Sequence, residues 1–238
     1  ARANAKAMDM EIARGHYRGP LHGIPIALKD LVDTEGVATT YGSKSFRDRV
    51  PSADATLVTR LKTAGCINLG KLTMSELAMV GPPGFGKETL NPWNTSHAPG
   101  GSSSGSATAV AAGLCAGSIG SDTGGSIRFP AANNNIVGLM PTYGRVSRKG
   151  VMPLSWTLDH VGPMTRTVED AALILNSISG FDPADRTTST ESVSDFRSAL
   201  SSDIKGLQIG ILEDSFVGIH PDIEEAMEKS IKVFEALG

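Results

Sequence analysis

The stretch from Gly100 to Pro130 constrains what this chain can fold into more than any other. Two loops rich in glycine and serine, the first serine loop (Gly100–Ser106) and the second serine loop (Gly120–Pro130), flank a run of small residues over Ala107–Ser118. Such small side chains favour a buried helix that runs into a strand. Glycine lets the main chain approach a ligand, and successive amide N–H groups in such loops bind negative charge. Two such loops on one short unit predict a functional site.

Patterns along the rest of the chain predict alternating strands and helices. Short apolar runs indicate strands, which are expected at Leu21–Asp30, Cys66–Leu69, Ile136–Leu139 and Leu207–Leu212. Capping residues and apolar residues at helical spacing indicate helices. Helices are expected at Ala3–Ala13, Thr73–Val80 and from Pro221 onward. Two more are expected between a capping Ser52 and Gly65, and at Val168–Ser179 after a capping Thr167. This alternation predicts an α/β fold with a central mixed, largely parallel sheet flanked by helices.

The length of the chain allows one domain with a sizeable core. Of its 238 residues 40% are hydrophobic and 20% are charged, as is typical of soluble globular proteins. The sequence opens inside a predicted helix and stops at Gly238 just after another, where an α/β chain normally enters a further strand. We therefore expect residues 1–238 to form a single domain that is incomplete at both ends and that pairs with a C-terminal half.

Charge and composition exclude several classes of function. The formal net charge of −3, with both signs interspersed, leaves no basic footprint, so no direct nucleic-acid partner is expected. No apolar run approaches the length of a membrane span, and the N-terminus shows no secretory pattern. Cys66 and Cys115 indicate no disulfide framework, which favours a reducing, cytoplasmic compartment. No motif indicates a metal site, and no cofactor is expected.

Two local patterns resemble known sites but lack a required part. Gly81–Glu88 nearly matches a phosphate-binding P-loop, but Glu88 stands where a Ser or Thr must bind magnesium, and no predicted strand precedes it. Asp122-Thr123-Gly124 resembles an aspartic-protease loop, but the chain has no second copy to supply the paired carboxylate. The sequence therefore favours neither nucleotide binding nor aspartic-protease chemistry.

The first serine loop also matches a third pattern. Gly101–Gly105 satisfies the G-x-S-x-G nucleophile elbow of α/β-hydrolases, with Ser103 at its centre. That elbow follows a strand, and the preceding Asn91–Pro99 does not have the pattern of one. A triad through His160 or His220 is therefore an unfavoured alternative. For either serine loop alone, a purely structural turn is the preferred interpretation.

The two serine loops together resemble the amidase signature family, serine hydrolases that use a Ser–Ser–Lys triad. Other landmarks of this family occur in the family's order along the chain: Gly23–Asp30, Gly70-Lys71 with Met74 and Glu76, Asn91–Asn94, Pro141–Arg145 and Leu158–Pro163. The resemblance implies that Ser126 is the nucleophile, that Ser102, preceded by a cis peptide bond, is the bridging serine, and that Lys29 is the base.

The resemblance also implies how the surroundings of the triad act. The amides around Thr123, Gly124, Gly125 and Ser126 would bind the oxyanion of a tetrahedral intermediate. Met79 resembles a position on the pocket wall, although core filling is an equal alternative, and Ser103 is a candidate substrate contact. Asp122 and Arg128 are expected to hold the shape of the second serine loop rather than to take part in the chemistry.

The chemistry requires Lys29 to be a neutral amine. An exposed lysine is protonated at neutral pH, but desolvation at the end of a buried strand lowers its pKa. Lys29 would then accept a proton from Ser102, whose hydroxyl both donates and accepts and so relays a proton from Ser126. Without the serine loops, Lys29 would be interpreted as a surface lysine paired with Asp30.

The resemblance implies a hydrolase that cleaves the carbon–nitrogen bond of a small-molecule amide through an acyl-enzyme on Ser126. Cleavage of a carbamate or an ester by the same route is an alternative. A further alternative is the glutaminase component of a tRNA-dependent amidotransferase, its A subunit, which works only inside a heteromeric assembly. Asn133–Asn135 departs from the family pattern directly after the second serine loop. This departure would change either the packing beneath the loop or the polarity of the substrate pocket, so the substrate is not predicted from the resemblance.

Overall fold

The computed structural model describes residues 1–79, 81–201 and 203–238. Within it the chain divides into two compact units, Ala1–Arg197 and Ser198–Gly238. The first unit contains the β-sheet and both serine loops, so it holds the region from which the candidate site is built.

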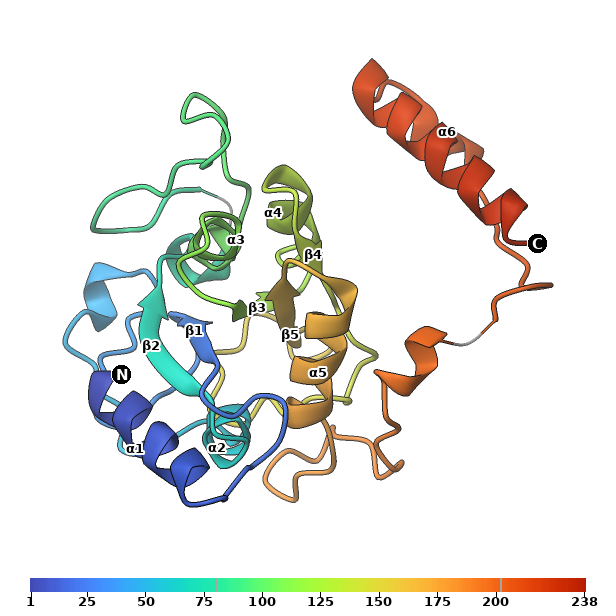
Figure 1. Cartoon of the computed structure of the whole chain (residues 1–238). Coiled ribbons are helices and arrows are strands. Elements are labelled where there is room, and N and C mark those ends of the chain that lie inside the picture. Colours follow the sequence, from blue (N-terminus) through green and yellow to red (C-terminus); the bar gives the residue numbers. More distant parts are fainter. Residues whose placement is uncertain (80, 202) are drawn as a thin grey trace. The chain divides into compact units, whose positions relative to one another are not determined.

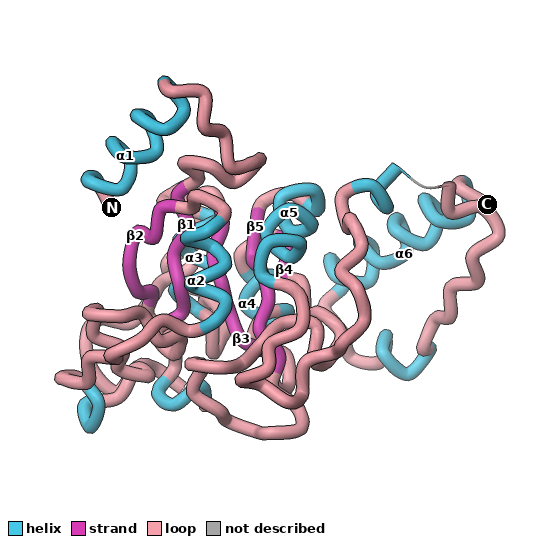
Figure 2. Tube along the Cα trace, turned by 90° about the horizontal axis from the view of Figure 1, so that it is seen from below, coloured by secondary structure: helices cyan, strands magenta, loops and turns pink. Residues whose placement is uncertain are grey.

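The sheet of the first unit has five strands in the order β2-β1-β3-β5-β4 (Figures 1 and 2). Their bounds are β1 Pro25–Lys29, β2 Ile67–Leu72, β3 Gly117–Asp122, β4 Val137–Gly138 and β5 His160–Thr165. Strand β1 pairs in parallel with β2 and β3, whereas β5 pairs antiparallel with β3 and β4. The predicted α/β class with a mixed sheet is confirmed.

Helices accompany these strands along the chain (Figure 1). In the first unit they are α1 Arg2–Ala13, α2 Thr56–Thr63, α3 Ser104–Ala111, α4 Arg128–Asn133 and α5 Val168–Ile178, and the second unit contains α6 Pro221–Ala236. None of the helices in the described part of the chain is long and apolar enough to cross a membrane.

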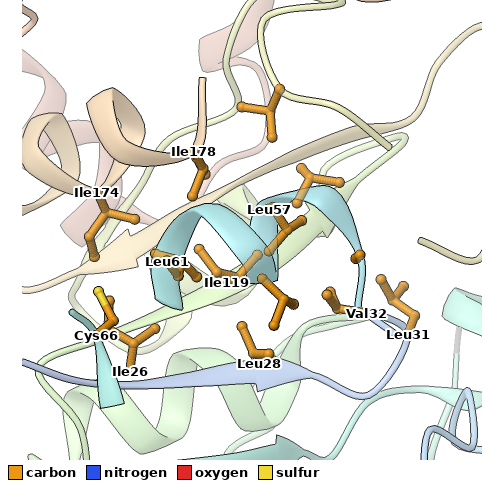
Figure 3. Close-up of a cluster of buried hydrophobic side chains, with 14 of the residues drawn as sticks. Ile26, Leu28, Leu31, Val32, Leu57, Leu61, Cys66, Ile119, Ile174 and Ile178 are labelled. Atoms are coloured by element: carbon orange, nitrogen blue, oxygen red, sulfur yellow. The ribbon is translucent and has the colours of Figure 1, made fainter. Parts of the chain in front are cut away.

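The two faces of β1 pack against different helices. Ile26 and Leu28 belong to the largest core cluster, which also contains side chains of α2 and α5 (Figure 3). Ala27 packs instead with Ala109 and Val110 of α3. Because successive side chains of a strand point to opposite faces, Lys29 shares the face of Ala27. The alternation of β1 thus directs Lys29 toward the α3 side, where the first serine loop lies.

Several predicted helix boundaries need correction. The cap at Thr167 is confirmed, since its hydroxyl accepts a hydrogen bond from Asp170 N at the start of α5. Ser52 caps no helix, because α2 begins only at Thr56, after Ala55. The helix predicted over Thr73–Val80 is reduced to a 3₁₀ turn at Glu76–Ala78, and Val80 lies outside the described residues.

The strand predicted at Leu207–Leu212 in the second unit is absent. Its apolar side chains, including Leu207, Ile209 and Leu212, are exposed, and the described part of that unit contains no strand with which it could pair. A strand needs a hydrogen-bonded neighbour, so apolar content alone does not produce one. Helix α6 begins at Pro221 as predicted, with Ile223, Met227 and Phe234 exposed.

Candidate active site

Lys29 is the last residue of β1 and is completely buried. Its Nζ donates hydrogen bonds to Ser102 Oγ at 2.7 Å and to Ser121 Oγ at 2.9 Å. These two hydroxyls come from the first serine loop and from the end of β3. The structure therefore brings the predicted base into contact with the predicted bridging serine, 73 residues apart in sequence. The alternative of a surface lysine paired with Asp30 is excluded by this burial.

Burial lowers the pKa of the Lys29 amine from its usual 10.5 to about 7, because the charged form loses its hydration. The negative charges of Asp122 and Asp159 oppose this effect and favour the ammonium. The balance leaves the amine able to exchange its proton near neutral pH. A group with its pKa near the working pH is well suited to general acid–base chemistry.

Ser102 lies in the first serine loop and is nearly inaccessible to solvent. The peptide bond between Gly101 and Ser102 is cis, as the family resemblance implied. The Ser102 carbonyl accepts a hydrogen bond from Ser75 N at 3.1 Å, which fixes the main chain at this point. The Ser102 hydroxyl is thereby directed toward Lys29, while the residue also lines the large cavity of the first unit.

Ser103 does not contact the cavity, so its prediction as a substrate contact needs correction. It is fully buried, donates from Oγ to Ser121 O at 3.2 Å and accepts at Oγ from Ser121 N at 3.3 Å. Its own N–H donates to Ser126 O at 3.3 Å. Ser103 therefore ties the first serine loop to the second, and its hydroxyl is occupied by main chain rather than by a histidine.

Asp122 organises the second serine loop from inside. Its buried carboxylate accepts hydrogen bonds from the amides of Gly125, Ile127 and Arg128 and from the Arg128 guanidinium. Burial raises the pKa of this carboxyl, but the bonds from Arg128 and from the three amides outweigh that effect, so the net pKa is lowered. The contacts bear out the expected shape-holding role of Asp122 and Arg128. They also leave the carboxylate occupied, unlike that of an aspartic protease.

Ser126 follows in the same loop and is partly exposed. Its hydroxyl has no hydrogen-bond partner among residues 1–79, 81–201 and 203–238, and the same holds for the amides of Thr123, Gly124 and Ser126. The Gly125 amide instead donates to Asp122 at 2.7 Å, so in this arrangement it is not free to bind an oxyanion. The predicted set of oxyanion donors therefore loses Gly125, while Ser126 keeps its main-chain N–H as a candidate.

A cavity of about 710 Å³ opens onto these groups. Ser102, Thr123, Gly124, Gly125 and Ser126 all line it, as does Met79, which is half exposed there rather than filling the core. Its other walls are largely apolar and include Pro82, Pro83, Phe129, Leu154 and Leu158. The cavity therefore has room for a substrate beside the Ser126 hydroxyl.

Two residues at the site were missed at the sequence level. Ser121 contacts Lys29, but no pattern distinguishes its hydroxyl from those of the neighbouring serines; the contact depends on how β1 and β3 end beside each other. Asp159 accepts a hydrogen bond from Thr123 Oγ1 at 2.6 Å. It lies inside the landmark Leu158–Pro163, so the sequence marked its position but not its partner.

The other patterns found in the sequence are structural or belong to the cavity wall. Gly81–Glu88 follows a 3₁₀ turn rather than a strand and contributes several residues to the cavity wall. His160 is engaged through Nδ1 with Leu158 O at 2.6 Å and packs edge-on against Tyr143. His220 belongs to the second unit, where it caps α6. Across the described residues no group of three or more His, Cys, Asp or Glu side chains is arranged to hold a metal ion.

Comparisons with known proteins agree on one family. The sequence model of the Amidase family matches residues 1–238. The A subunit of the glutamyl-tRNA(Gln) amidotransferase of Carboxydothermus hydrogenoformans is 48% identical over 237 residues, which cover 98% of this chain and 49% of that protein. The chain thus spans about half the length of the curated relatives it matches.

Solved structures give the same result. The peptide amidase of Stenotrophomonas maltophilia matches with a TM-score of 0.80 and 46% identity over 83% of this chain and 42% of the amidase. The A subunit of the glutamyl-tRNA(Gln) amidotransferase of Thermotoga maritima matches with a TM-score of 0.87 and 40% identity over 91% of this chain and 48% of that protein. Both likenesses extend to sequence as well as fold.

Proposed function

The chain belongs to the Amidase family, and on this premise we propose that it hydrolyses the carbon–nitrogen bond of an amide through an acyl-enzyme on Ser126. One observation carries the proposal. A fully buried lysine with a pKa near 7 contacts Ser102, and Ser102 shares a cavity with the unpartnered hydroxyl of Ser126. A buried amine next to a serine pair can act as the base that activates a serine nucleophile without a histidine.

The proposed reaction begins with proton transfer along the two serines. The unpartnered Ser126 hydroxyl first turns toward Ser102. As Ser126 Oγ attacks the amide carbon, its proton passes to Ser102 Oγ, and the Ser102 proton passes to neutral Lys29. The hydrogen bond to Ser121 occupies one N–H of Lys29. When the amine is neutral, its lone pair can take the position toward Ser102 that an N–H takes in the ammonium. When the carbon–nitrogen bond breaks, the proton returns along the same route to the leaving amine. Water, activated by the same relay, then hydrolyses the ester on Ser126.

The negative charge of the tetrahedral intermediate needs stabilisation near the second serine loop. The amides of Thr123, Gly124 and Ser126 are free to donate hydrogen bonds to it, and removing one such donor costs about 2.7–4 kcal/mol in other serine hydrolases. The bonds of Asp122 to this loop hold the main chain in shape before substrate arrives. The loop is therefore preorganised for the charge that develops.

Two substrate classes fit the site, and we place a free-standing amidase first. The largely apolar cavity wall supports a small-molecule amide with an apolar acyl group, and the likeness to a peptide amidase agrees with this. The glutaminase component of an amidotransferase is the second candidate, because the named relatives at up to 50% identity are the A subunits of glutamyl-tRNA(Gln) amidotransferases. Carbamates and esters would follow the same route.

The length of the relatives bears on the partners of this chain, and its cysteines bear on the compartment. Since the relatives are about twice as long, we propose that a C-terminal region completes the walls of the cavity. In the second candidate function, further subunits would carry the tRNA, and this chain itself would not bind nucleic acid. Both cysteines are unpaired and buried, which supports a reducing compartment such as the cytoplasm.

Labelling with a fluorophosphonate tests the nucleophile. Mass spectrometry of peptides from the labelled protein should locate the adduct on Ser126, and Ser126→Ala should abolish both labelling and turnover. Ser103→Ala is the matched control, because it removes a buried hydroxyl from the competing G-x-S-x-G pattern. It should leave Ser126 labelled. An adduct on Ser103 that persists in the Ser126→Ala variant would contradict the proposal.

A substrate panel then separates the two classes. Hydrolysis of aryl amides or peptide amides by the purified protein alone would support the free-standing amidase. Release of ammonia from glutamine only in the presence of copurifying subunits would support the amidotransferase component. Comparing matched amide, carbamate and ester substrates identifies the preferred bond.

A further inference from the structure

Asp159 is buried and connects three segments around the candidate site. Its carboxylate accepts hydrogen bonds from Thr123 Oγ1 at 2.6 Å, from Leu154 N at 2.8 Å and from Ser155 N at 3.0 Å. The antiparallel register of β3 with β5 pairs Asp122 with His160, so Thr123 and Asp159 lie directly beyond that pair. The register of the two strands therefore places this contact, one position beyond their last pair.

Two of the three partners of Asp159, Thr123 and Leu154, line the cavity. Thr123 supplies one of the free amides of the second serine loop, and Leu154 forms part of the apolar wall. One carboxylate thus holds a main-chain donor and a wall residue at once. Loss of these hydrogen bonds would leave both the Thr123 amide and the cavity wall at Leu154 less precisely positioned.

Asp159 also lies close to Lys29 along the end of β3: its partner Thr123 stands two residues after Ser121, whose hydroxyl accepts a hydrogen bond from Lys29 Nζ. Asp122 and Asp159 are the two acidic groups whose charges favour the ammonium form of Lys29. Asp122 is ion-paired with Arg128 at 3.0 Å, whereas the Asp159 carboxylate has no Lys or Arg partner in the described part of the chain. Arg148 donates to the main-chain oxygen of Asp159 at 3.4 Å, and His160 is the next residue, but neither is bonded to the carboxylate. The carboxylate of Asp159 is therefore less directly paired than that of Asp122.

We propose that Asp159 is a positioning residue of the hydrolytic reaction: it fixes Thr123 of the second serine loop against the cavity wall at Leu154 and sets the electrostatic environment of Lys29. This inference rests on the proposed function. It assigns to one residue two effects that different substitutions separate. Asp159→Asn removes the charge and also replaces one of the two accepting oxygens by an NH2 group, so its pH profile reports the charge and its kcat reports both effects. Thr123→Val removes only the hydrogen bond to Asp159 and keeps the charge.

In the intact protein, Asp159→Asn should shift the acidic limb of the kcat/KM profile to lower pH by about half a unit or more, because a nearby opposite charge that raised the pKa of Lys29 is lost. Thr123→Val should leave that limb unchanged but lower kcat about tenfold, less than the loss of a whole oxyanion donor. Thr123→Ser retains the hydroxyl and should restore kcat. When Asp159→Asn and Thr123→Val are combined, the acidic limb should move about as far as in Asp159→Asn alone. The loss in kcat should be smaller than the two single losses combined, because both variants break the same hydrogen bond.

Asp182→Asn is the matched control. Asp182 is equally buried and accepts a hydrogen bond from Thr56 Oγ1 at 2.6 Å and from a main-chain amide, but it does not line the cavity. It should lower the unfolding midpoint without moving either kinetic readout. Should Asp159→Asn fail to fold, Thr123→Val and Thr123→Ser still test the proposal through kcat.

The inference is overturned if the acidic limb of Asp159→Asn coincides with that of the wild type, or if Thr123→Val matches the wild type in kcat. It is also overturned if Asp182→Asn reproduces the same kinetic changes. Failure of the proposed function is recognised separately, because turnover would then survive Ser126→Ala.

Discussion

Asn134 donates from its fully buried side-chain amide to the carbonyl oxygen of Pro99 at 2.6 Å. The same amide donates to Pro130 O at 2.8 Å, so one side chain connects the segment that enters the first serine loop with the helix that follows the second. The run Asn133–Asn135, which departs from the family pattern, contributes no residue to the cavity wall. Its departure therefore bears on how the two loops are held together and not on the polarity of the pocket.

Removing this side chain should destabilise the protein. Asn134→Ala leaves the buried Pro99 O without its donor, whereas Pro130 O keeps the bond from Asn134 N at 3.1 Å. We expect the free energy of unfolding to fall by about 1–3 kcal/mol. Denaturant unfolding monitored by fluorescence of the tryptophans measures the change. Asn133→Ala is the control, because its side chain is less buried and makes only a 3.4 Å contact to Ala98 O. Equal losses in the two variants would show that Asn134 has no special role.

The sequence predicted the parts of the site that depend on local pattern or on family motifs. β1, α3 and β3 lie where the small and apolar runs indicated, and the alternation along β1 explains why Lys29 faces Ser102. The role of Ser103 was mistaken, because a pattern read along the chain does not show that Ser121 of β3 would take its hydroxyl. The strand β5, with Gly162 and Pro163 inside it, was not expected, since neither residue favours strands by itself.

Gly105 of α3 should tolerate no side chain. A Cβ there would lie 2.6 Å from Thr73 O and 2.7 Å from Thr73 N, both main-chain atoms that cannot rotate away. Gly105→Ala should therefore lower the free energy of unfolding by about 1–3 kcal/mol or more through overpacking. At Gly124 a Cβ would meet nothing within 4 Å, so Gly124→Ala should change stability by less than about 0.5 kcal/mol. Equal unfolding midpoints for the two variants would contradict the packing described here.

The activity of the enzyme should rise with pH through the pKa of Lys29, about 7, because only the neutral amine accepts the proton of Ser102. Lys29→Met keeps most of the volume and removes the amine, so kcat should fall by orders of magnitude, as expected for a group that acts as part of a unit. Lys29→Arg should not restore activity, since a guanidinium stays protonated.

Histidine variants provide the contrast. Because His160 is engaged with Leu158 O and is not bonded to a serine, His160→Gln should leave the shape of the pH profile unchanged. His220→Gln should do the same. A Lys29→Met enzyme with near-wild-type kcat, together with an inactive histidine variant, would refute the mechanism and favour a histidine-based triad.

The buried Lys29 amine should also make the free energy of unfolding depend on pH. In the folded chain the pKa of Lys29 is about 7, whereas in the unfolded chain it returns to about 10.5. Between these values the unfolded state binds the extra proton, so the free energy of unfolding rises with pH, by roughly 1.4 kcal/mol per pH unit for this group. The contribution of Lys29 to the free energy of unfolding is complete above about pH 10.5 and is lost as the pH falls to about 7. Lys71, whose pKa burial lowers to about 8, adds a similar trend in both proteins compared below.

The difference between wild type and Lys29→Met isolates Lys29. Urea unfolding of both proteins at several pH values between about 7 and 10 should give a wild-type curve that rises more steeply than the Lys29→Met curve, and the two slopes should agree below about pH 6, where Lys29 is protonated in both states. The loss of the bonds to Ser102 and Ser121 shifts the Lys29→Met curve by an amount that varies little with pH. Parallel curves over the whole range would mean that Lys29 keeps an ordinary pKa when folded, and the proposed base would then have no neutral form to act with at neutral pH.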